Sequence, residues 1–394
     1  MSPGSIREYA TTLRPRYLAA ARLDKERILT EFCRVTGYHR KSAIRLLRRP
    51  PRPSRTRRGR PRLYGPLVTQ TLRQIWEASD YLCSKRLAPF LPELVRVLER
   101  HGELRLPSSL RTAVLTVSPP TIDRLLHPFR RPGLRRPHSA SSSSPSLKAQ
   151  VPIRTWGEWG HVRPGALQAD LVAHCGESLD GFFLHSLVAV DVATAWTDCQ
   201  VIWGKAYQRV VNSLDFVRRT LPFPLRELHT DNGGEFLNHI VLPWCQRAGI
   251  RLTRGRPYRK NDQAHAEQRV WSTVRRLVGY DRYSSQAAFE TLRHLYARLR
   301  LYVNFFQPTA KLKGKVRRGA RIIKRYDRPQ TPYRRLLGSG VLTKQQQTAL
   351  DGVYQNLNPV RLRQEIQDAL QALWKLADQP REVTPVLRQR PPSR

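Results

Sequence analysis

Three acidic residues have surroundings that suggest chemistry. Asp170 interrupts the apolar run QADLVA, and Asp231 follows the β-like run LRELHT and precedes two glycines. Glu267 lies on a segment with helical periodicity, with 35 residues between it and Asp231. A carboxylate inside an apolar strand is costly unless it binds something. Mg²⁺ prefers oxygen ligands, and a pair of divalent ions held by such carboxylates can assist phosphoryl transfer.

The alternatives are that Asp231 only forms a turn and that Glu267 only lies on a solvated helix face. The chain has 30 acidic residues, so the spacing alone would arise by chance. The secondary structure predicted around the three acids makes their pattern more specific. Alternating apolar runs predict strands at 166–174, 182–191, 197–203, 225–230 and 249–254, and helices at 214–222, 235–249, 262–279 and 286–306. Hairpin-linked strands followed by strands that alternate with helices indicate an α/β domain with a mixed sheet.

Three segments together resemble one known family. They are ADLVAH (169–174), HTDNGGEF (229–236) and NDQAHAEQ (261–268). They are similar to the catalytic core of the DDE-type transposase and retroviral-integrase superfamily, and most similar to bacterial insertion-sequence transposases. The family pattern is Asp, then Asp-Asn-Gly-x-Glu-Phe, then a distant Glu, which matches Asp170, Asp231 and Glu267.

The resemblance implies a ribonuclease-H-like fold, with a five-stranded mixed sheet and flanking helices. It implies that Asp170, Asp231 and Glu267 are both the catalytic residues and the ligands of two Mg²⁺ or Mn²⁺ ions. The implied reaction is cleavage at transposon ends, followed by attack of the freed 3′-hydroxyl on target DNA. The chain departs from retroviral integrases in having no His/His/Cys/Cys zinc module.

Residues next to the acids are expected to support them. Asn232 is expected to shape the turn after Asp231, and Gly233 allows backbone and metal to approach closely. A basic loop containing an aromatic residue leads to the helix of Glu267, and its expected DNA contacts are Arg256, Tyr258, Arg259 and Lys260. A solvated loop is the alternative.

The charge of the chain points to a polyanionic partner. Its 70 Lys and Arg against 30 Asp and Glu give a formal net charge of +40. The charge is +21 over residues 1–150, +6 over 151–300 and +13 over 301–394. Such an excess favours nucleic acid as the partner, here double-stranded DNA. The nearly balanced middle is where three carboxylates must approach a phosphate.

The first 49 residues predict a helix-turn-helix, which makes an all-α DNA-binding region ahead of the core. A helical stripe ends at Gly37, and a second, basic helix follows with Arg40, Lys41 and Arg45 as expected DNA contacts. An ordinary helical hairpin with a solvated basic face is the alternative. The linker at 50–65 contains Arg58 and Arg60, which either enter a minor groove or form a basic tether.

The rest of the chain divides by composition. A second helical, helix-turn-helix-like domain is expected at 66–127, with a helix beginning at Pro89 and Pro92 and another at Pro119 after the N-cap Ser118. Later segments are a Pro/Ser/Arg linker at 128–150, the catalytic core at 151–308, a basic β-like DNA-binding segment at 309–340, and C-terminal helices and tail at 341–394. Three tryptophans, Trp196, Trp203 and Trp271, are expected in the core.

Several classes of protein are disfavoured. No apolar run approaches the length of a spanning helix, and the first residues lack the apolar stretch of a secretory signal. Five scattered cysteines without a CxxC pair favour reduced thiols. These features favour the cytoplasm, and the resemblance implies a bacterial protein associated with the nucleoid. Neither a membrane nor a small molecule is expected as partner.

Together with the resemblance, these features predict a transposase that binds terminal repeats and integrates DNA. The resemblance also implies a homo-oligomer. Two other readings stay open. One is a sequence-specific DNA-binding regulator with an inactive core. The other is a nuclease of the same fold that only hydrolyses DNA.

Overall fold

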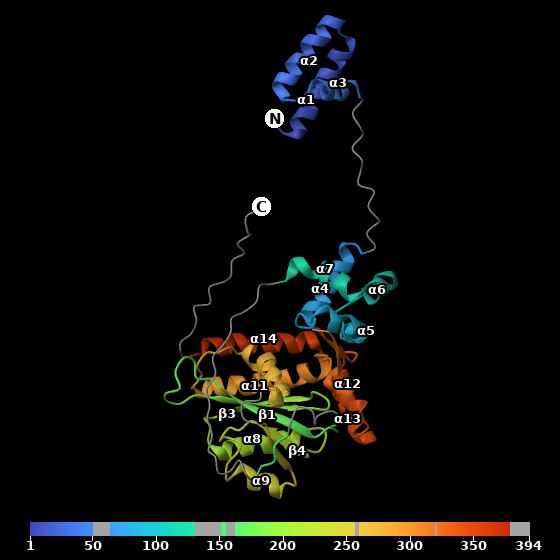
Figure 1. The fold of residues 1–394 in the computed structure, drawn as a ribbon. Helices are drawn as coiled ribbons and strands as arrows, with labels where there is room; N and C mark the ends of the chain where they lie inside the picture. Colours follow the sequence, from blue (N-terminus) through green and yellow to red (C-terminus); the bar gives the residue numbers. More distant parts are fainter. Residues whose placement is uncertain (50–63, 131–150, 155–161, 257–259, 320, 379–394) are drawn as a thin grey trace. The chain divides into compact units, whose positions relative to one another are not determined.

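The computed structural model describes residues 1–49, 64–130, 151–154, 162–256, 260–319 and 321–378 (Figure 1). The chain divides into two compact units, residues 1–63 and 64–394, and each is described by itself. Within the described residues, no helix is long and apolar enough to cross a membrane. The predicted linkers at 50–65 and 128–150 fall almost entirely outside the described residues, and so do Arg58 and Arg60.

Three helices form the first unit: α1 (Pro3–Ala19), α2 (Arg22–Thr36) and α3 (Arg40–Arg48). Gly37 has a φ of 72° and ends α2, which confirms the predicted break, because this left-handed conformation favours glycine. Ile28, Phe32 and Leu47 are buried between the helices. The apolar stripes of α2 and α3 therefore face each other, and the basic side of α3 faces outward.

The basic residues of α3 differ in their surroundings. Lys41 and Arg45 are exposed. Arg40 forms an ion pair with Glu26 of α2, with 3.2 Å between Nη2 and Oε1. Arg40 therefore also links the two helices, and an exposed pair of this kind contributes at most about 1 kcal/mol to stability.

A five-stranded mixed sheet forms the centre of the second unit, with the strand order β3-β2-β1-β4-β5. The strands are β1 (Ala166–Ala173), β2 (His185–Asp191), β3 (Thr197–Ile202), β4 (Glu227–Thr230) and β5 (Arg251–Arg254). The first three pair antiparallel, whereas β4 runs parallel to β1 and to β5. This arrangement confirms the predicted fold class.

Helices cover both faces of the sheet (Figure 1). On one face lie α8 (Tyr207–Thr220) and α9 (Val241–Arg247), packed on Leu167 and Ala169 of β1. On the other lie α10 (Ala264–Arg269), its π-helical continuation η5 (Val270–Arg275) and α11 (Gln286–Phe306), with Val172 in their core. Alternate residues of a strand point to opposite faces, so Asp170 shares the face of Val172 and α10.

Residues 64–130 fold as helices that belong to the same compact unit as the sheet. They are α4 (Pro66–Ala78), α5 (Ser84–Arg100), α6 (Ser108–Leu115), α7 (Pro119–Leu126) and the 3₁₀ turn η1 (His127–Phe129). The Tyr302 hydroxyl of α11 donates to the carbonyl of Ala78 at 2.7 Å, and the Gln307 amide donates to that of Ser79 at 2.9 Å. Both contacts join α4 to the end of α11.

One helix boundary in this region was predicted wrongly. The helix expected to begin at Pro89 and Pro92 begins at Ser84, and both prolines lie inside α5. Each proline removes a backbone donor. Leu87, Leu91 and neighbouring apolar side chains nevertheless form a fully buried stripe across them, and this burial offsets the lost hydrogen bonds. The predicted start of α7 at Pro119, after Ser118, is confirmed.

The last described part contains a hairpin and three helices. The hairpin pairs β6 (Leu312–Arg318) with β7 (Arg321–Tyr326), and α12 (Pro332–Leu337), α13 (Lys344–Asn356) and α14 (Pro359–Lys375) follow. Helix α14 lies along α11, on the side away from the sheet (Figure 1). Tyr333 and Tyr354 stack at 4.8 Å between ring centroids and join α12 to α13.

Candidate active site

Asp170 and Asp231 are brought together by the pairing of β1 with β4. The parallel register runs to Ala169 opposite Thr230, so the two aspartates are the next residues on each strand. Asp170 accepts a hydrogen bond from the backbone N–H of Leu171 at 2.8 Å. The end of the β1–β4 pairing therefore places the two carboxyl groups side by side, Asp170 within β1 and Asp231 just after β4.

Glu267 reaches this place because a buried amide of β1 binds the start of its helix. Gln168 is fully buried, and its Oε1 accepts from the backbone N–H groups of His265 at 3.0 Å and Ala266 at 3.2 Å. Its Nε2 donates to the carbonyl of Asp262 at 3.0 Å. Gln168 and Asp170 lie two residues apart on one face of the strand, so the first turn of α10 is fixed beside Asp170.

Gln263 makes a second link between the same elements. Its Nε2 donates to the carbonyl of Ala169 at 2.7 Å, and the side chain is buried. The start of α10 is thus attached to β1 by the side chain of Gln168 on the strand and by that of Gln263 before the helix. The carboxylate of Glu267, in the first turn of α10, is exposed to solvent.

The electrostatics of Asp170 show that the acids are close to one another. Its pKa is raised from 3.8 to about 7, first by burial and then by the negative charge of Asp231, with smaller contributions from Glu267 and Glu235. Glu235 also has a raised pKa, caused by burial and by Asp231. Four carboxyl groups thus repel one another here, which makes the site favourable for cations.

The turn after Asp231 is held by backbone and side-chain contacts. Asp231 Oδ1 accepts from the N–H of Gly233 at 2.9 Å. The Asn232 amide donates to the carbonyl of Gly255 at 2.9 Å, and its oxygen accepts from Arg254 at 3.0 Å. Asn232 therefore shapes the turn, as expected, by linking it to the end of β5.

Gly233 leaves the space that two carboxyl groups occupy. A Cβ atom there would lie 2.9 Å from Asp231 Oδ1 and 2.8 Å from the Glu235 carboxyl carbon. We expect Gly233→Ala to lower activity at least about tenfold, because the displaced carboxyl groups no longer face the site. The cost in unfolding free energy is expected to be below about 1 kcal/mol, because the tips of flexible side chains can move.

Gly234→Ala is the matched control, because a Cβ there meets nothing within 4 Å. Reaction rates and thermal unfolding of both variants check the prediction. Equal activity of the two variants would contradict it.

Comparisons with known proteins concern the family of the chain. Residues 161–260 match the family model of the integrase core domain. The chain is 46% identical over 323 residues to uncharacterized protein y4rM of Sinorhizobium fredii (strain NBRC 101917 / NGR234), covering 81% of this chain and 91% of the relative. The chain belongs to the integrase-core family. A solved structure, the catalytic core domain of BIV integrase, is 23% identical, with a TM-score of 0.30, and the match covers 44% of this chain and 95% of that one.

The matched span of the integrase core includes Asp170 and Asp231 but ends before Glu267. The position of Glu267 at the site therefore depends on the Gln168 contacts described above. Within the described residues, no three His, Cys, Asp or Glu side chains lie close enough together to hold a single metal ion. The three acids are near enough for their charges to act on Asp170, and their donor atoms are the carboxylate oxygens that Mg²⁺ prefers.

The expected DNA contacts near the integrase core are only partly described. Tyr258 and Arg259 fall outside the described residues, and so does the side chain of Lys260. Arg256 donates through Nε and Nη2 to the buried carboxylate of Asp262, at 2.8 and 3.0 Å, and its own side chain is 42% exposed. Arg256 thus closes the base of this loop, and a role in DNA contact stays a prediction.

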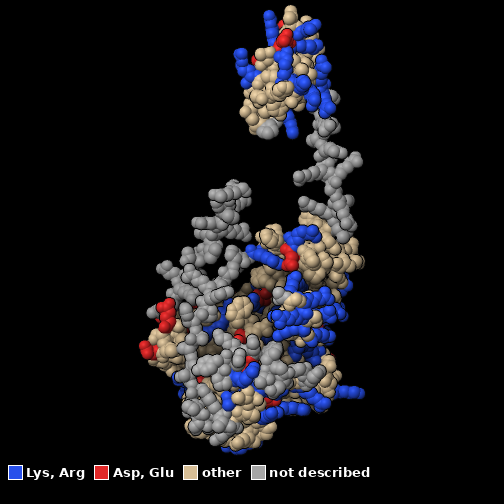
Figure 2. Space-filling view, viewed as in Figure 1, with Lys and Arg blue, Asp and Glu red and all other residues tan. Residues whose placement is uncertain are grey.

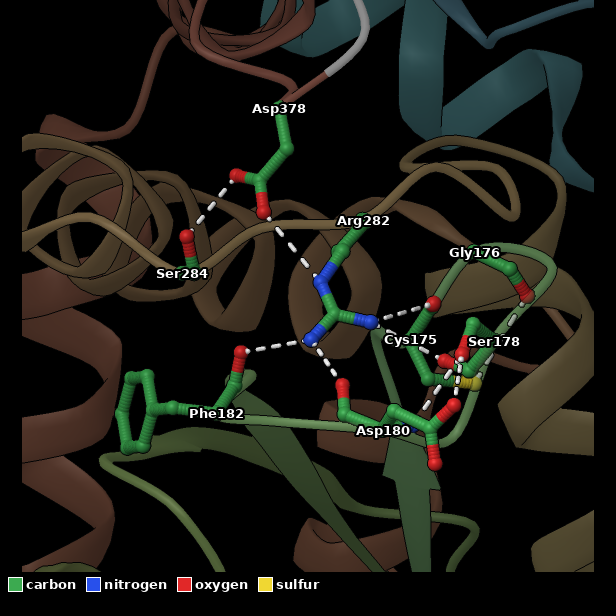
Figure 3. Close-up of polar contacts among 8 residues, drawn as sticks. All are labelled: Cys175, Gly176, Ser178, Asp180, Phe182, Arg282, Ser284 and Asp378. Atoms are coloured by element: carbon green, nitrogen blue, oxygen red, sulfur yellow. Dashed lines mark hydrogen bonds and ion pairs between the residues drawn. The ribbon is translucent and has the colours of Figure 1, made fainter.

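Arg282 holds the loop between β1 and β2 (Figure 3). Its guanidinium donates to the carbonyls of Cys175 at 3.2 Å, Ser178 at 3.0 Å and Phe182 at 3.0 Å, and to that of Asp180. Its Nε forms an ion pair with Asp378 at 3.3 Å. The loop that follows the strand of Asp170 is therefore attached to the chain beyond α14.

Three residues that contact the site or act on its charge were missed from the sequence. Glu235 had a signal, because it is the Glu of the Asp-Asn-Gly-x-Glu-Phe pattern. Gln168 had a weaker signal, because it lies on the face of Asp170 within an apolar strand. Gln263 had none beyond its place at the start of a helix, where a polar residue is ordinary.

Proposed function

We propose that the protein is a transposase that binds the ends of a mobile DNA element, cleaves them and joins them to target DNA. The observation that carries this proposal is the grouping of Asp170, Asp231 and Glu267, in which the charges of the last two raise the pKa of the first. Such a group suits a divalent cation and an approaching phosphodiester, as in metal-assisted phosphoryl transfer.

In this proposal Asp170, Asp231 and Glu267 would hold two Mg²⁺ or Mn²⁺ ions. Bound cations supply neutralisation of the phosphate charge and activation of the attacking oxygen. The buried Gln168 fixes the helix of Glu267, and Gly233 keeps space for the carboxyl group of Asp231. These residues orient the acids around one phosphodiester.

The two steps share one chemistry. In cleavage, water attacks phosphorus, the bond to the 3′-oxygen breaks, and a 3′-hydroxyl is released. In strand transfer, that hydroxyl attacks a phosphodiester of the target, a new bond joins the strands, and the target's own 3′-oxygen leaves with a proton. The exposed Lys41 and Arg45 of α3 support binding of the element's end by the first unit. We further propose that a homo-oligomer holds two ends together.

Asp231→Asn provides the direct test. The substrate is labelled DNA from the regions that flank the gene, incubated with the full chain and Mg²⁺. We expect cleavage and strand transfer to fall at least about 1000-fold, because several kcal/mol of transition-state stabilisation are lost. Affinity for the DNA is expected to change little, because removing one negative charge does not remove a phosphate contact.

Asp215→Asn on α8 is the matched control, because Asp215 lies on a helix of the opposite sheet face and pairs with Arg218 at 2.9 Å. It should leave cleavage unchanged. If Asp231→Asn cuts as fast as the parent chain, the proposed function is wrong. Cleavage without any joined product would instead favour a nuclease that only hydrolyses.

A further inference from the structure

A large groove lies beside the helix that carries Glu267. Its volume is about 1900 Å³, and residues from several separate elements line it. The start of α5 contributes Lys85 and Arg86, the hairpin β6–β7 contributes Lys315 and Lys324, and the α10–η5 helix contributes Trp271. The groove is therefore built from the helical region, the integrase core and the hairpin together.

The groove has an excess of positive charge that its own acids do not neutralise. Eight Lys or Arg side chains line it against two acids, Asp80 and Asp327. Asp80 pairs with Arg276, and Asp327 pairs with Arg335 at 2.6 Å. Within the described residues, by contrast, no acidic side chain lies within ion-pair distance of the groove lysines and Arg86. Three of the four lysines that line the groove, Lys85, Lys315 and Lys324, are exposed.

The hairpin is the most basic wall. Residues 312–326 contain seven Lys or Arg and no acid, and nearly all of them are exposed. Lys315 lies directly opposite Lys324 in the antiparallel register. Like charges in this position destabilise a strand pair, and a two-stranded hairpin alone is marginally stable. Figure 2 shows a dense block of Lys and Arg on one flank of the larger unit, which fits a surface that binds a polyanion.

Trp271 gives the groove a second property. It was expected in the core, but 58% of it is exposed, so that prediction was wrong. The prediction holds for Trp196, which is buried. Trp271 follows Glu267 by four residues on one continuous helical segment, so the two side chains occupy neighbouring turns of one side. A large exposed aromatic ring among cations is the arrangement on which unpaired bases stack.

We propose that this groove binds a strand of the DNA substrate, with Lys315 and Lys324 on its phosphates and an unpaired base stacked on Trp271. The proposal deepens the proposed function and rests on it, because it names how DNA near a cleavage site is held beside Glu267. The ring would keep the end of the strand unpaired, next to the acids. Cations from α5 and the hairpin would hold the backbone on either side of it.

The test measures binding of the full chain, in an Asp231→Asn background that does not cut. One probe is a blunt duplex, and the other is the same duplex with a short single-stranded 3′ tail that contains 2-aminopurine. We expect Trp271→Ala to weaken binding of the tailed duplex by about 5- to 100-fold and to abolish quenching of 2-aminopurine. Binding of the blunt duplex should stay within about twofold. Trp271→Phe should retain most of the effect, because it keeps an aromatic face.

The lysines are tested by Lys315→Gln/Lys324→Gln. Both probes should bind more weakly, and the slope of log K against log salt should fall by about 1.5 to 2. Lys344→Gln/Lys375→Gln is the matched control, because it removes the same charge from two exposed lysines of the same unit that do not line the groove.

Two results would overturn the proposal. One is a Trp271→Ala variant that binds the tailed duplex and quenches its 2-aminopurine as the parent does. The other is tighter binding of polyglutamate than of either DNA, which would assign the groove to an acidic protein segment. Because binding is measured without cleavage, these results are separate from the fate of the proposed function. That function fails if Asp231→Asn cuts like the parent chain, if the parent chain never cuts, or if it cuts without joining strands.

Discussion

In the presence of a chelator, Asp170→Asn is expected to unfold at a higher temperature than the parent chain at pH 8, although it should be inactive. Asp170 is the most strongly perturbed of the site acids, with a pKa of about 7 against an ordinary value of 3.8. Burial and the charges of neighbouring acids disfavour its ionised form. Asparagine keeps the shape of the side chain and removes that charge.

The direction of the pH dependence follows from the raised pKa. The folded state holds the proton more tightly than the unfolded state, so the carboxyl group is least unfavourable to folding below about pH 4. Stability falls as the pH rises from about 4 to about 7, where the folded protein must finally ionise. The full loss is at most about 4 kcal/mol, since each pKa unit corresponds to 1.36 kcal/mol. The difference between variant and parent should therefore grow over that window and level off above it.

Circular dichroism melts at pH 5 and pH 8, with and without Mg²⁺, check this prediction. Mg²⁺ at pH 8 should raise the unfolding temperature of the parent chain and have little effect on Asp170→Asn, because binding to the folded state stabilises it. Glu290→Gln on α11 serves as the control, since Glu290 is a surface acid paired with Arg293 at 2.7 Å. A parent chain whose melts are the same at both pH values in chelator would show that the acids do not repel one another as described.

The sheet and the first two acids could be predicted because their signals are local. Apolar runs of strand length, separated by turn residues, predicted all five strands of the sheet, and Asp191 begins the turn after β2. It accepts from the backbone N–H of Thr194 at 2.7 Å. Asp170 and Asp231 then follow from neighbouring strands of one parallel pair.

Features that depend on distant contacts could not be predicted. The prolines inside α5 are tolerated only because residues from the rest of the unit bury its apolar stripe. The exposure of Trp271 depends on where α5 and the hairpin leave a groove. The long helix expected at 235–249 is shortened to Val241–Arg247, and Asn238 accepts from the N–H groups of Ile240 and Val241 at 2.9 Å before it begins. The apolar pattern could not show that Asn238 would bind the N–H groups at the beginning of a shorter helix.

The position of Glu267 is the clearest case of a feature set by distant contacts. The residue that fixes this position gives the second prediction with a large expected effect. Spacing along the chain says nothing about how far a helix lies from a strand. That distance is set by Gln168, whose amide makes three hydrogen bonds to the start of α10. Gln168→Leu keeps the approximate volume and removes all three. It leaves two N–H groups and one carbonyl buried without this partner, at roughly 1–3 kcal/mol each if they find no other.

We expect Gln168→Leu to lower the rate of cleavage about 10- to 100-fold and to raise the Mg²⁺ concentration needed for half-maximal activity by a similar factor. Residues that orient metal ligands have effects of this size. DNA affinity should not change, because Gln168 is fully buried and lies outside the basic groove. A purely structural role would reduce the amount of folded protein without moving the Mg²⁺ requirement.

Gln200→Leu is the matched control for this change. Gln200 lies on β3 of the same sheet, and its amide donates to Asp198 at 2.7 Å without touching α10. It should keep the Mg²⁺ requirement of the parent chain. If Gln168→Leu also keeps that requirement, the helix of Glu267 is held by other contacts, of which the Gln263 bond to Ala169 is the first to test. If only Gln168→Leu shifts it, a buried amide two residues before Asp170 sets the geometry of the third acid.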